Sequence, residues 1–259
     1  MANLTVAVTG QRATVTLARP QLRNAFNDEL IAELTEAFRT LGGRDDVRVI
    51  VLAAEGPAFC AGADLNWMRR MADYSRDDNL ADAARLAAML RTIDACSKPT
   101  VARVQGDVYA GGMGLVAVCD IALAVPTAGF CLSEVKLGLI PATIGPYVVR
   151  AMGVRAAQRY VLTAERFDAA EALRIGFVHE VVSAELLDAR VDAIVQALCS
   201  AGPAAVAAAK RLVRDVADAP LDDALVARTV EAIADIRASA EGREGVQAFL
   251  QKRQPSWLG

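Results

Sequence analysis

One glutamate has surroundings that could give it a chemical role. Glu134 lies within residues 128–141, where most of its neighbours are apolar or small. Burial of a carboxylate disfavours its charged form and raises its pKa toward the range in which it transfers protons at neutral pH. Glu134 is therefore a candidate general base. The alternative is a surface glutamate paired with Lys136 at the end of a strand, since glutamate is rarely buried.

Two segments that contain glycine and other small residues could supply backbone donors to the same reaction. Residues 59–65 combine small residues, which let a ligand approach backbone N–H groups, with Asp64, which suits the N-cap of a following helix. Residues 106–115 contain four glycines and lead into another predicted helix, whose first N–H groups could face a developing negative charge. For both segments the alternative is a turn that binds nothing.

The second segment also matches the spacing of a dinucleotide-binding fingerprint. Gly112, Gly114 and Ala117 have that spacing, and Glu134 follows twenty residues after Gly114. The fingerprint requires its glycines directly after the first strand and its acidic residue at the end of the next strand. Here several residues intervene, and the next predicted strand, residues 121–125, ends well before Glu134. We therefore exclude a nucleotide-binding role for this segment.

Alternating strands and helices must position these segments. The first twenty residues alternate in hydropathy around residues 9–12, which predicts a hairpin. Asn27 predicts the N-cap of a helix that ends at Gly42-Gly43. Further apolar and periodic runs predict strands at 47–53, 100–104 and 121–125 and a helix at 79–93. This alternation is typical of an α/β fold.

The pattern changes in the last third of the chain. Helical patterns follow one another at 184–201, 203–216, 221–239 and 244–252. We therefore divide the chain into an α/β body, residues 1–200, and a C-terminal helical region, residues 201–259. Such a region must pack against something, and another subunit is a reasonable candidate.

Composition excludes several functional classes. The chain has 259 residues with 28 Lys and Arg against 31 Asp and Glu, which argues against a nucleic-acid-binding protein. One histidine, His179, is too few for most zinc sites and its strand-like surroundings suggest a structural role, so we expect no metal site. Five cysteines without a C-x-x-C pair predict reduced thiols. Without a targeting or membrane-spanning pattern, we expect a cytoplasmic protein that does not bind membranes.

In their order along the chain, these segments resemble the crotonase superfamily, also called the enoyl-CoA hydratase/isomerase family. The resemblance covers nearly the whole chain. The segments that carry it are residues 18–20, 23–26, 59–65, 106–120, 133–141, 162–176 and 249–253. It implies a spiral of repeated ββα units with a C-terminal helical trimerisation region, and therefore a homotrimer or a homohexamer.

The resemblance also implies an acyl-CoA thioester as substrate. CoA then enters as part of the substrate, and no metal, nucleotide or redox cofactor is expected. The N–H groups of Ala63 and Gly111 would form the oxyanion hole, with Glu134 as the catalytic carboxylate. Contacts with CoA would fall on Arg23, Ala25, Ala61, Gly62, Asp64 and Leu65, and on Phe249 and Lys252 from a tail.

The chain departs from the family's hydratase pattern at one position. The best-known hydratases use two glutamates, and the residue that corresponds to the first is Gly114. Single-glutamate members include Δ3,Δ2-enoyl-CoA isomerases. However, residues 64–68, 111–115, 133–135 and 146–150 resemble the bacterial methylglutaconyl-CoA hydratases, which also carry glycine there. We therefore expect a hydratase for a glutaconyl-type 2-enoyl-CoA, such as 3-methylglutaconyl-CoA or isohexenylglutaconyl-CoA. An isomerase and a non-catalytic acyl-CoA-binding protein remain the alternatives.

Glutaconyl substrates carry a distal carboxylate, which needs a partner in the protein. Arg69, Arg70 and Arg150 are cationic candidates, although each could equally be a solvated surface charge. Trp67 and Met68 could line an acyl pocket or serve only in packing. One hypothesis is that the substrate's own carboxylate positions water in place of the missing glutamate.

Overall fold

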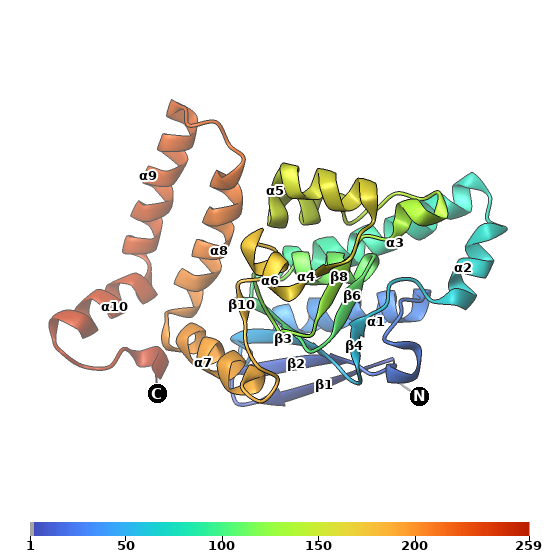
Figure 1. Ribbon diagram of the computed structural model, residues 1–259. Coiled ribbons are helices and arrows are strands. Elements are labelled where there is room, and N and C mark those ends of the chain that lie inside the picture. Colours follow the sequence, from blue (N-terminus) through green and yellow to red (C-terminus); the bar gives the residue numbers. More distant parts are fainter. Residues whose placement is uncertain (1–2, 259) are drawn as a thin grey trace.

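The computed structural model describes residues 3–258, which form two sheets surrounded by helices (Figure 1). The larger sheet has the strand order β1-β2-β3-β5-β7-β10. Its strands are β1 (Leu4–Thr9), β2 (Arg12–Leu17), β3 (Val49–Ala54), β5 (Thr100–Val104), β7 (Ile121–Ala124) and β10 (Glu180–Val181). The first two strands form the predicted antiparallel hairpin, and the other neighbours are parallel.

The smaller sheet has the strand order β4-β6-β8-β9. Its strands are β4 (Ala58–Cys60), β6 (Asp107–Tyr109), β8 (Gly129–Cys131) and β9 (Phe167–Asp168). Each of the first three follows directly after a strand of the larger sheet, and a helical segment comes next in the chain. This repetition confirms the expected spiral of ββα units. All six residues of β3 are buried, as is typical of a strand in a parallel sheet covered on both faces.

The helices of the body are α1 (Asp28–Gly42), α2 (Leu65–Ala72), α3 (Arg76–Asp94), α4 (Gly111–Ala117), α5 (Gly145–Thr163), α6 (Ala169–Arg174) and α7 (Leu187–Ser200). Four of these seven described helices, α1, α2, α3 and α6, begin at a residue whose side chain caps them. The Asn27 side chain accepts a hydrogen bond from the N–H of Leu30 at 2.8 Å, which confirms the predicted cap of α1. Ser75 and Asp78 form a capping box at the start of α3.

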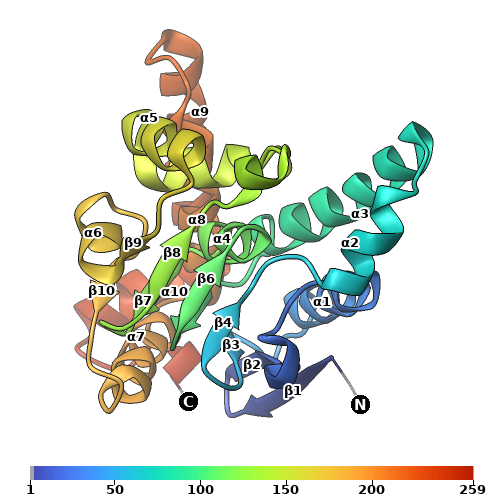
Figure 2. The ribbon, with the colours of Figure 1, turned by 45° about the vertical axis from the view of Figure 1, so that its right-hand side comes forward.

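The C-terminal helices lie to one side of the body in Figure 1 and behind it in Figure 2. They are α8 (Pro203–Ala217), α9 (Asp223–Ala238) and α10 (Ala240–Leu250). Large apolar side chains on them are exposed, among them Val213, Val230 and Phe249. Among the described helices none is by itself long and apolar enough to cross a membrane, and only the bent pair α7–α8 meets those criteria jointly.

The strand predicted around His179 is shorter than its pattern indicates. Only Glu180 and Val181 pair with β7, because Phe177 and Val178 turn into the core. The Phe177 ring packs edge-on against Phe130, with 5.6 Å between the ring centroids. His179 has a structural contact, since its Nδ1 accepts a hydrogen bond from the N–H of Ala122 at 3.0 Å.

Candidate active site

A cavity of about 620 Å³ opens between α2, α3, the start of α4 and the loop that follows β8. Its wall is mostly apolar and includes Phe26, Met71, Leu86, Ile140 and Ile144. Three of the residues singled out in the sequence, Ala63, Gly111 and Glu134, also line it. The fold therefore brings together three segments that are up to 71 residues apart in the sequence (134 minus 63).

Glu134 has the environment that the apolar segment predicts. It begins a short 3₁₀ helix, Glu134–Leu137, and its Oε2 atom is buried without a hydrogen-bond partner among the described residues. Burial raises the pKa of its carboxyl above the usual value. Lys136 is exposed and forms no ion pair with Glu134 in the described part of the chain, so the surface-pair alternative is wrong.

The first donor lies in the turn between β4 and α2. The N–H of Phe26 donates to the Gly62 carbonyl and the N–H of Asp64 donates to the Phe26 carbonyl, both at 2.7 Å. The N–H of Ala63, between these two bonds, has no acceptor in the described chain. Gly62 has φ +89°, a conformation that glycine adopts without strain.

The second donor lies in the turn between β6 and α4. Ala110 has φ +47°, which is strained for a residue with a Cβ atom, and its N–H is fixed to the Cys131 carbonyl at 2.9 Å. The next residue, Gly111, begins α4, so its N–H has no partner within that helix. A Cβ atom on Gly111 would lie 3.0 Å from the Phe26 ring, which explains why glycine fits there.

The two turns pack directly against each other. A Cβ atom on Gly62 would lie 3.0 Å from the Cβ of Ala110, so only glycine lets the turns approach this closely. The N–H groups of Ala63 and Gly111 are thereby held beside one cavity by backbone packing. Such a pair can bind a carbonyl oxygen and stabilise the negative charge that develops on it.

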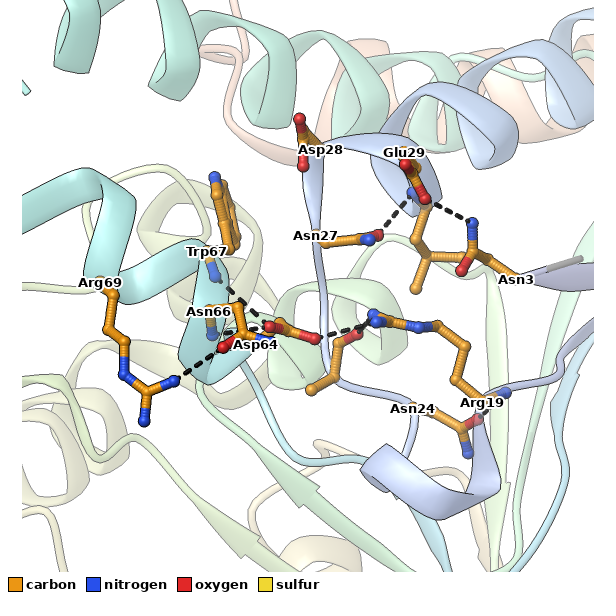
Figure 3. Close-up of polar contacts among 12 residues, drawn as sticks. Asn3, Arg19, Asn24, Asn27, Asp28, Glu29, Asp64, Asn66, Trp67 and Arg69 are labelled. Carbon is orange, nitrogen blue, oxygen red and sulfur yellow. Dashed lines mark hydrogen bonds and ion pairs between the residues drawn. The ribbon is translucent and has the colours of Figure 1, made fainter. Parts of the chain in front are cut away.

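Asp64 is a structural residue of the same turn (Figure 3). Its carboxylate accepts from the N–H of Asn66 at 2.8 Å, from that of Trp67 at 3.3 Å and from the Arg19 guanidinium at 2.9 Å. Burial alone would raise the pKa of this carboxyl, but these hydrogen bonds outweigh burial and lower it. The Asp64 side chain is thus occupied in capping α2, and its expected contact with CoA remains a prediction.

The other expected CoA contacts lie at different places. Arg23 has an exposed side chain, and its carbonyl accepts from the N–H of Ala61 at 2.9 Å, which places it beside the first turn. Ala25 is buried, whereas Leu65 is 69% exposed. Lys252 follows α10, on the opposite side of the body from α2 (Figures 1 and 2). One chain alone therefore does not bring Lys252 to its own cavity.

Gly114 faces a wall that has no room for a second carboxylate. A Cβ atom there would lie 2.3 Å from Cγ2 of Ile144 and 3.4 Å from Cδ2 of Leu90. Ile144 itself lines the cavity. A bulky isoleucine therefore fills the place from which a side chain at residue 114 would enter.

None of the three candidate arginines lines the cavity. Arg70 pairs with Asp28 at 2.6 Å, and Arg69 donates to the Asn66 side chain at 2.7 Å. Arg150 lies 4.0 Å from Asp94 and 3.7 Å from Asp218. These partners support the interpretation of the arginines as ordinary surface charges.

Sequence reasoning missed a polar part of the cavity wall. Asp82 and Asn79, both on α3, line it, and Asp82 is only 5% exposed. The Asp82 carboxylate accepts from Arg85 at 2.6 Å. Helical spacing could have indicated this, because Asp82 shares a face with Leu86 and Met89. The described residues include no group of three or more His, Cys, Asp or Glu side chains that could hold a metal ion.

Comparison with known sequences gives consistent matches. Residues 10–259 match the family described as Enoyl-CoA hydratase/isomerase. The chain is 37% identical over 237 residues to an enoyl-CoA hydratase of Alternaria alternata, covering 91% of this chain and 77% of that protein. It is 35% identical over 248 residues to a probable enoyl-CoA hydratase of Mycobacterium tuberculosis, covering 94% and 93%.

Solved structures agree with these sequence matches. An enoyl-CoA hydratase from Shewanella pealeana superimposes with a TM-score of 0.96 at 44% identity, covering 99% of this chain and 96% of that one. AtuE of Pseudomonas aeruginosa superimposes with a TM-score of 0.95 at 35% identity, and the match covers 100% of both chains.

Proposed function

Because this chain belongs to the enoyl-CoA hydratase/isomerase family, the crotonase superfamily, we propose that it hydrates a glutaconyl-type 2-enoyl-CoA with Glu134 as its single general base and acid. One observation carries the proposal. The buried carboxylate oxygen of Glu134 lies in the same cavity as two backbone N–H groups, and among the described residues none of the three has a hydrogen-bond partner. These are the parts required to add water across a double bond conjugated to a thioester.

The reaction follows from these parts. The thioester oxygen accepts hydrogen bonds from the N–H groups of Ala63 and Gly111, which draws electron density from the double bond. Glu134 takes a proton from water as the water oxygen bonds to C3, and negative charge moves to the thioester oxygen. Glu134 then returns that proton to C2. The raised pKa makes the Glu134 carboxylate a stronger base toward water, and the carboxylic acid that it forms is still acidic enough to protonate the enolate carbon.

An isomerase is the second candidate, favoured by the packing at Gly114. A shift of the double bond between carbons needs one base that takes and returns a proton, and no second carboxylate fits beside Ile144. The two reactions differ in substrate. Purified protein should consume the ultraviolet absorbance of a conjugated 2-enoyl thioester if it is a hydratase. If it is an isomerase, it should create that absorbance from a 3-enoyl thioester.

Four sequence motifs, which resemble those of bacterial methylglutaconyl-CoA hydratases, support a glutaconyl acyl group. They are residues 64–68, 111–115, 133–135 and 146–150. The cavity also contains polar groups beside its apolar wall, so it can accept more than a plain hydrocarbon chain. The test compares loss of absorbance for 3-methylglutaconyl-CoA and crotonyl-CoA. Rapid loss with the first alone supports the proposal. Equal rates would reject the acyl preference. No loss of absorbance with either substrate would reject the hydratase, and 3-enoyl thioesters would then be tested.

We further propose a trimer or hexamer assembled through α8–α10. The exposed apolar side chains on these helices support it, because surfaces of this kind mark interaction sites. In such an assembly, Lys252 of one copy could reach CoA bound to another. Light scattering of the Val230→Asp variant provides the test. A smaller particle than wild type is expected, and a monomeric wild-type protein would contradict the proposal.

A further inference from the structure

One side chain in the cavity wall has an unused hydrogen-bond donor. Trp67 lies in the first turn of α2, four residues after Ala63, and is only 4% exposed. It lines the cavity, and its Nε1–H has no acceptor among the described residues. Figure 3 shows the indole nitrogen on the edge of the ring that is turned away from Asp64.

A buried indole N–H normally finds a partner, because leaving it unpaired forfeits its hydrogen bond to water. The other tryptophan of the chain behaves in the usual way, since Nε1 of Trp257 donates to the Ser200 carbonyl at 3.2 Å. The unsatisfied donor is therefore specific to the tryptophan in the cavity. A ligand that brings an oxygen acceptor would satisfy it.

Two of the other polar side chains in the cavity wall, Asn79 and Asp82, are already engaged. The Asn79 amide donates to the carbonyls of Tyr74 and Ser75, at 3.3 and 3.1 Å. The Asp82 carboxylate accepts from Arg85, which neutralises much of its charge, and no Lys or Arg lines the described cavity wall. A substrate oxygen that enters this region thus finds the indole N–H of Trp67 as a buried donor without an acceptor among the described residues. The Thr143 hydroxyl, on the loop before α5, is another side-chain donor of the wall.

We infer that Trp67 is a specificity-determining residue, whose Nε1–H donates to an oxygen carried on the acyl chain of the substrate. This inference rests on the proposed function, under which that oxygen belongs to the distal carboxylate. The position fits, because Trp67 and the Ala63 donor lie on consecutive turns of backbone. Ala63 binds the thioester oxygen, and Trp67 binds an oxygen farther along the acyl chain.

The first test removes the donor and keeps an aromatic ring. The substrates are 3-methylglutaconyl-CoA and 3-methylbut-2-enoyl-CoA, which differ only in the carboxylate. For Trp67→Phe, kcat/KM with the carboxylate substrate should fall about 10- to 100-fold, mainly through KM, because a hydrogen bond to a charged group is lost. The value for the other substrate should remain close to wild type. Trp257→Phe is the matched control, since it removes an indole outside the cavity.

The outcomes separate the two proposals. If wild type shows no preference for the carboxylate substrate, the proposed acyl specificity fails. If wild type shows the preference and Trp67→Phe retains it, the role of Trp67 is overturned. Equal losses on both substrates would also overturn it, because they indicate a general packing role.

A second measurement leaves Trp67 unchanged and does not depend on the folding of its variant. In Trp257→Phe, Trp67 is the only tryptophan, so its fluorescence reports the cavity alone. The probes are glutaryl-CoA and butyryl-CoA, saturated thioesters that cannot be hydrated. A hydrogen bond to the carboxylate should shift the emission to longer wavelength with glutaryl-CoA only. Identical spectra with both probes would overturn the inference.

Discussion

Two parts of the cavity wall differ in whether they carry a carboxylate. In one part of the wall, the Oε2 atom of Glu134 is buried without a partner among the described residues, and burial raises the pKa of this carboxyl. Elsewhere in the wall, Ile144 lines the cavity and fills the space that a side chain at Gly114 would need. The first part keeps a reactive group at a cost in stability, whereas the second is packed as an ordinary core. Proton transfer is therefore expected from one side of the substrate only.

The largest effect should come from removing the one reactive carboxylate. Glu134→Gln keeps the size of the side chain and abolishes proton transfer, so kcat should fall about 10³-fold, within the usual range for a general acid–base group. Absorbance loss with the preferred enoyl-CoA measures the rate. Calorimetric titration with a saturated acyl-CoA should show that binding persists. Full activity in this variant would reject Glu134 as the base and require another group in that role.

The packing between Gly114 and Ile144 can be tested through the stability of the folded protein. Gly114→Ala places a methyl group 2.3 Å from Cγ2 of Ile144. Overpacking of this kind should lower the free energy of unfolding by about 1–3 kcal/mol. Urea denaturation measures the change. The double variant with Ile144→Gly should be less destabilised than the sum of its two single variants, because the clash is removed. Simple additivity would mean that the two positions do not compete for space.

The pH dependence of the rate should report the Glu134 part of the wall directly. The carboxylate must be ionised to take a proton from water, so kcat/KM should rise with pH through the pKa of Glu134. Because burial raises that pKa, the midpoint should lie above 4.5, the ordinary value for glutamate. A profile of kcat/KM against pH provides the measurement. A midpoint below 4.5 would contradict the burial of this group in solution.

The same shift has a consequence for stability with a defined sign. A carboxyl whose pKa is raised on folding destabilises the folded protein above its folded pKa, and this penalty disappears below the unfolded value. Glu134→Gln should therefore be more stable than wild type at neutral pH. The difference should shrink as the pH falls toward 4.5. Thermal denaturation at several pH values tests this, and a constant difference would oppose it.

The smallest effect is expected outside both parts of the wall. Arg70 does not line the cavity, and its pair with Asp28 is about half exposed on both sides. Arg70→Ala should change the free energy of unfolding by less than about 1 kcal/mol. It should also leave kcat/KM for both 3-methylglutaconyl-CoA and crotonyl-CoA close to wild type. A selective loss with the first substrate would restore Arg70 as a partner of the distal carboxylate.

Local signals allowed much of this architecture to be predicted. The Asn27 cap and the hairpin at residues 9–12 depend on neighbouring residues, so the sequence alone identifies them. The residues around Glu134 similarly reveal an apolar environment. By contrast, the close packing of Gly114 against Ile144 involves positions thirty residues apart in the sequence and depends on how α4 packs against α5. No local pattern encodes that contact.

The unused donor of Trp67 was equally hidden. The sequence shows a tryptophan near a turn, which is compatible with packing or with a pocket. Only the placement of α2 and α3 around one cavity reveals that its N–H lacks an acceptor. The strand predicted near His179 is too long for a related reason. Phe177 and Val178 are apolar because they pack in the core, and they do not pair in the sheet.

The close contact between Gly62 and Ala110 makes one end of the cavity harder to redesign than the other. Both donor turns are locked by backbone packing, so replacing either residue would move both N–H groups together. The end of the cavity that binds the thioester is thus held rigidly by the backbone. The acyl end is formed by side chains of α2, α3 and the loop after Glu134, each of which can be exchanged separately. New acyl groups should therefore be reached by engineering that end, with the thioester chemistry left intact.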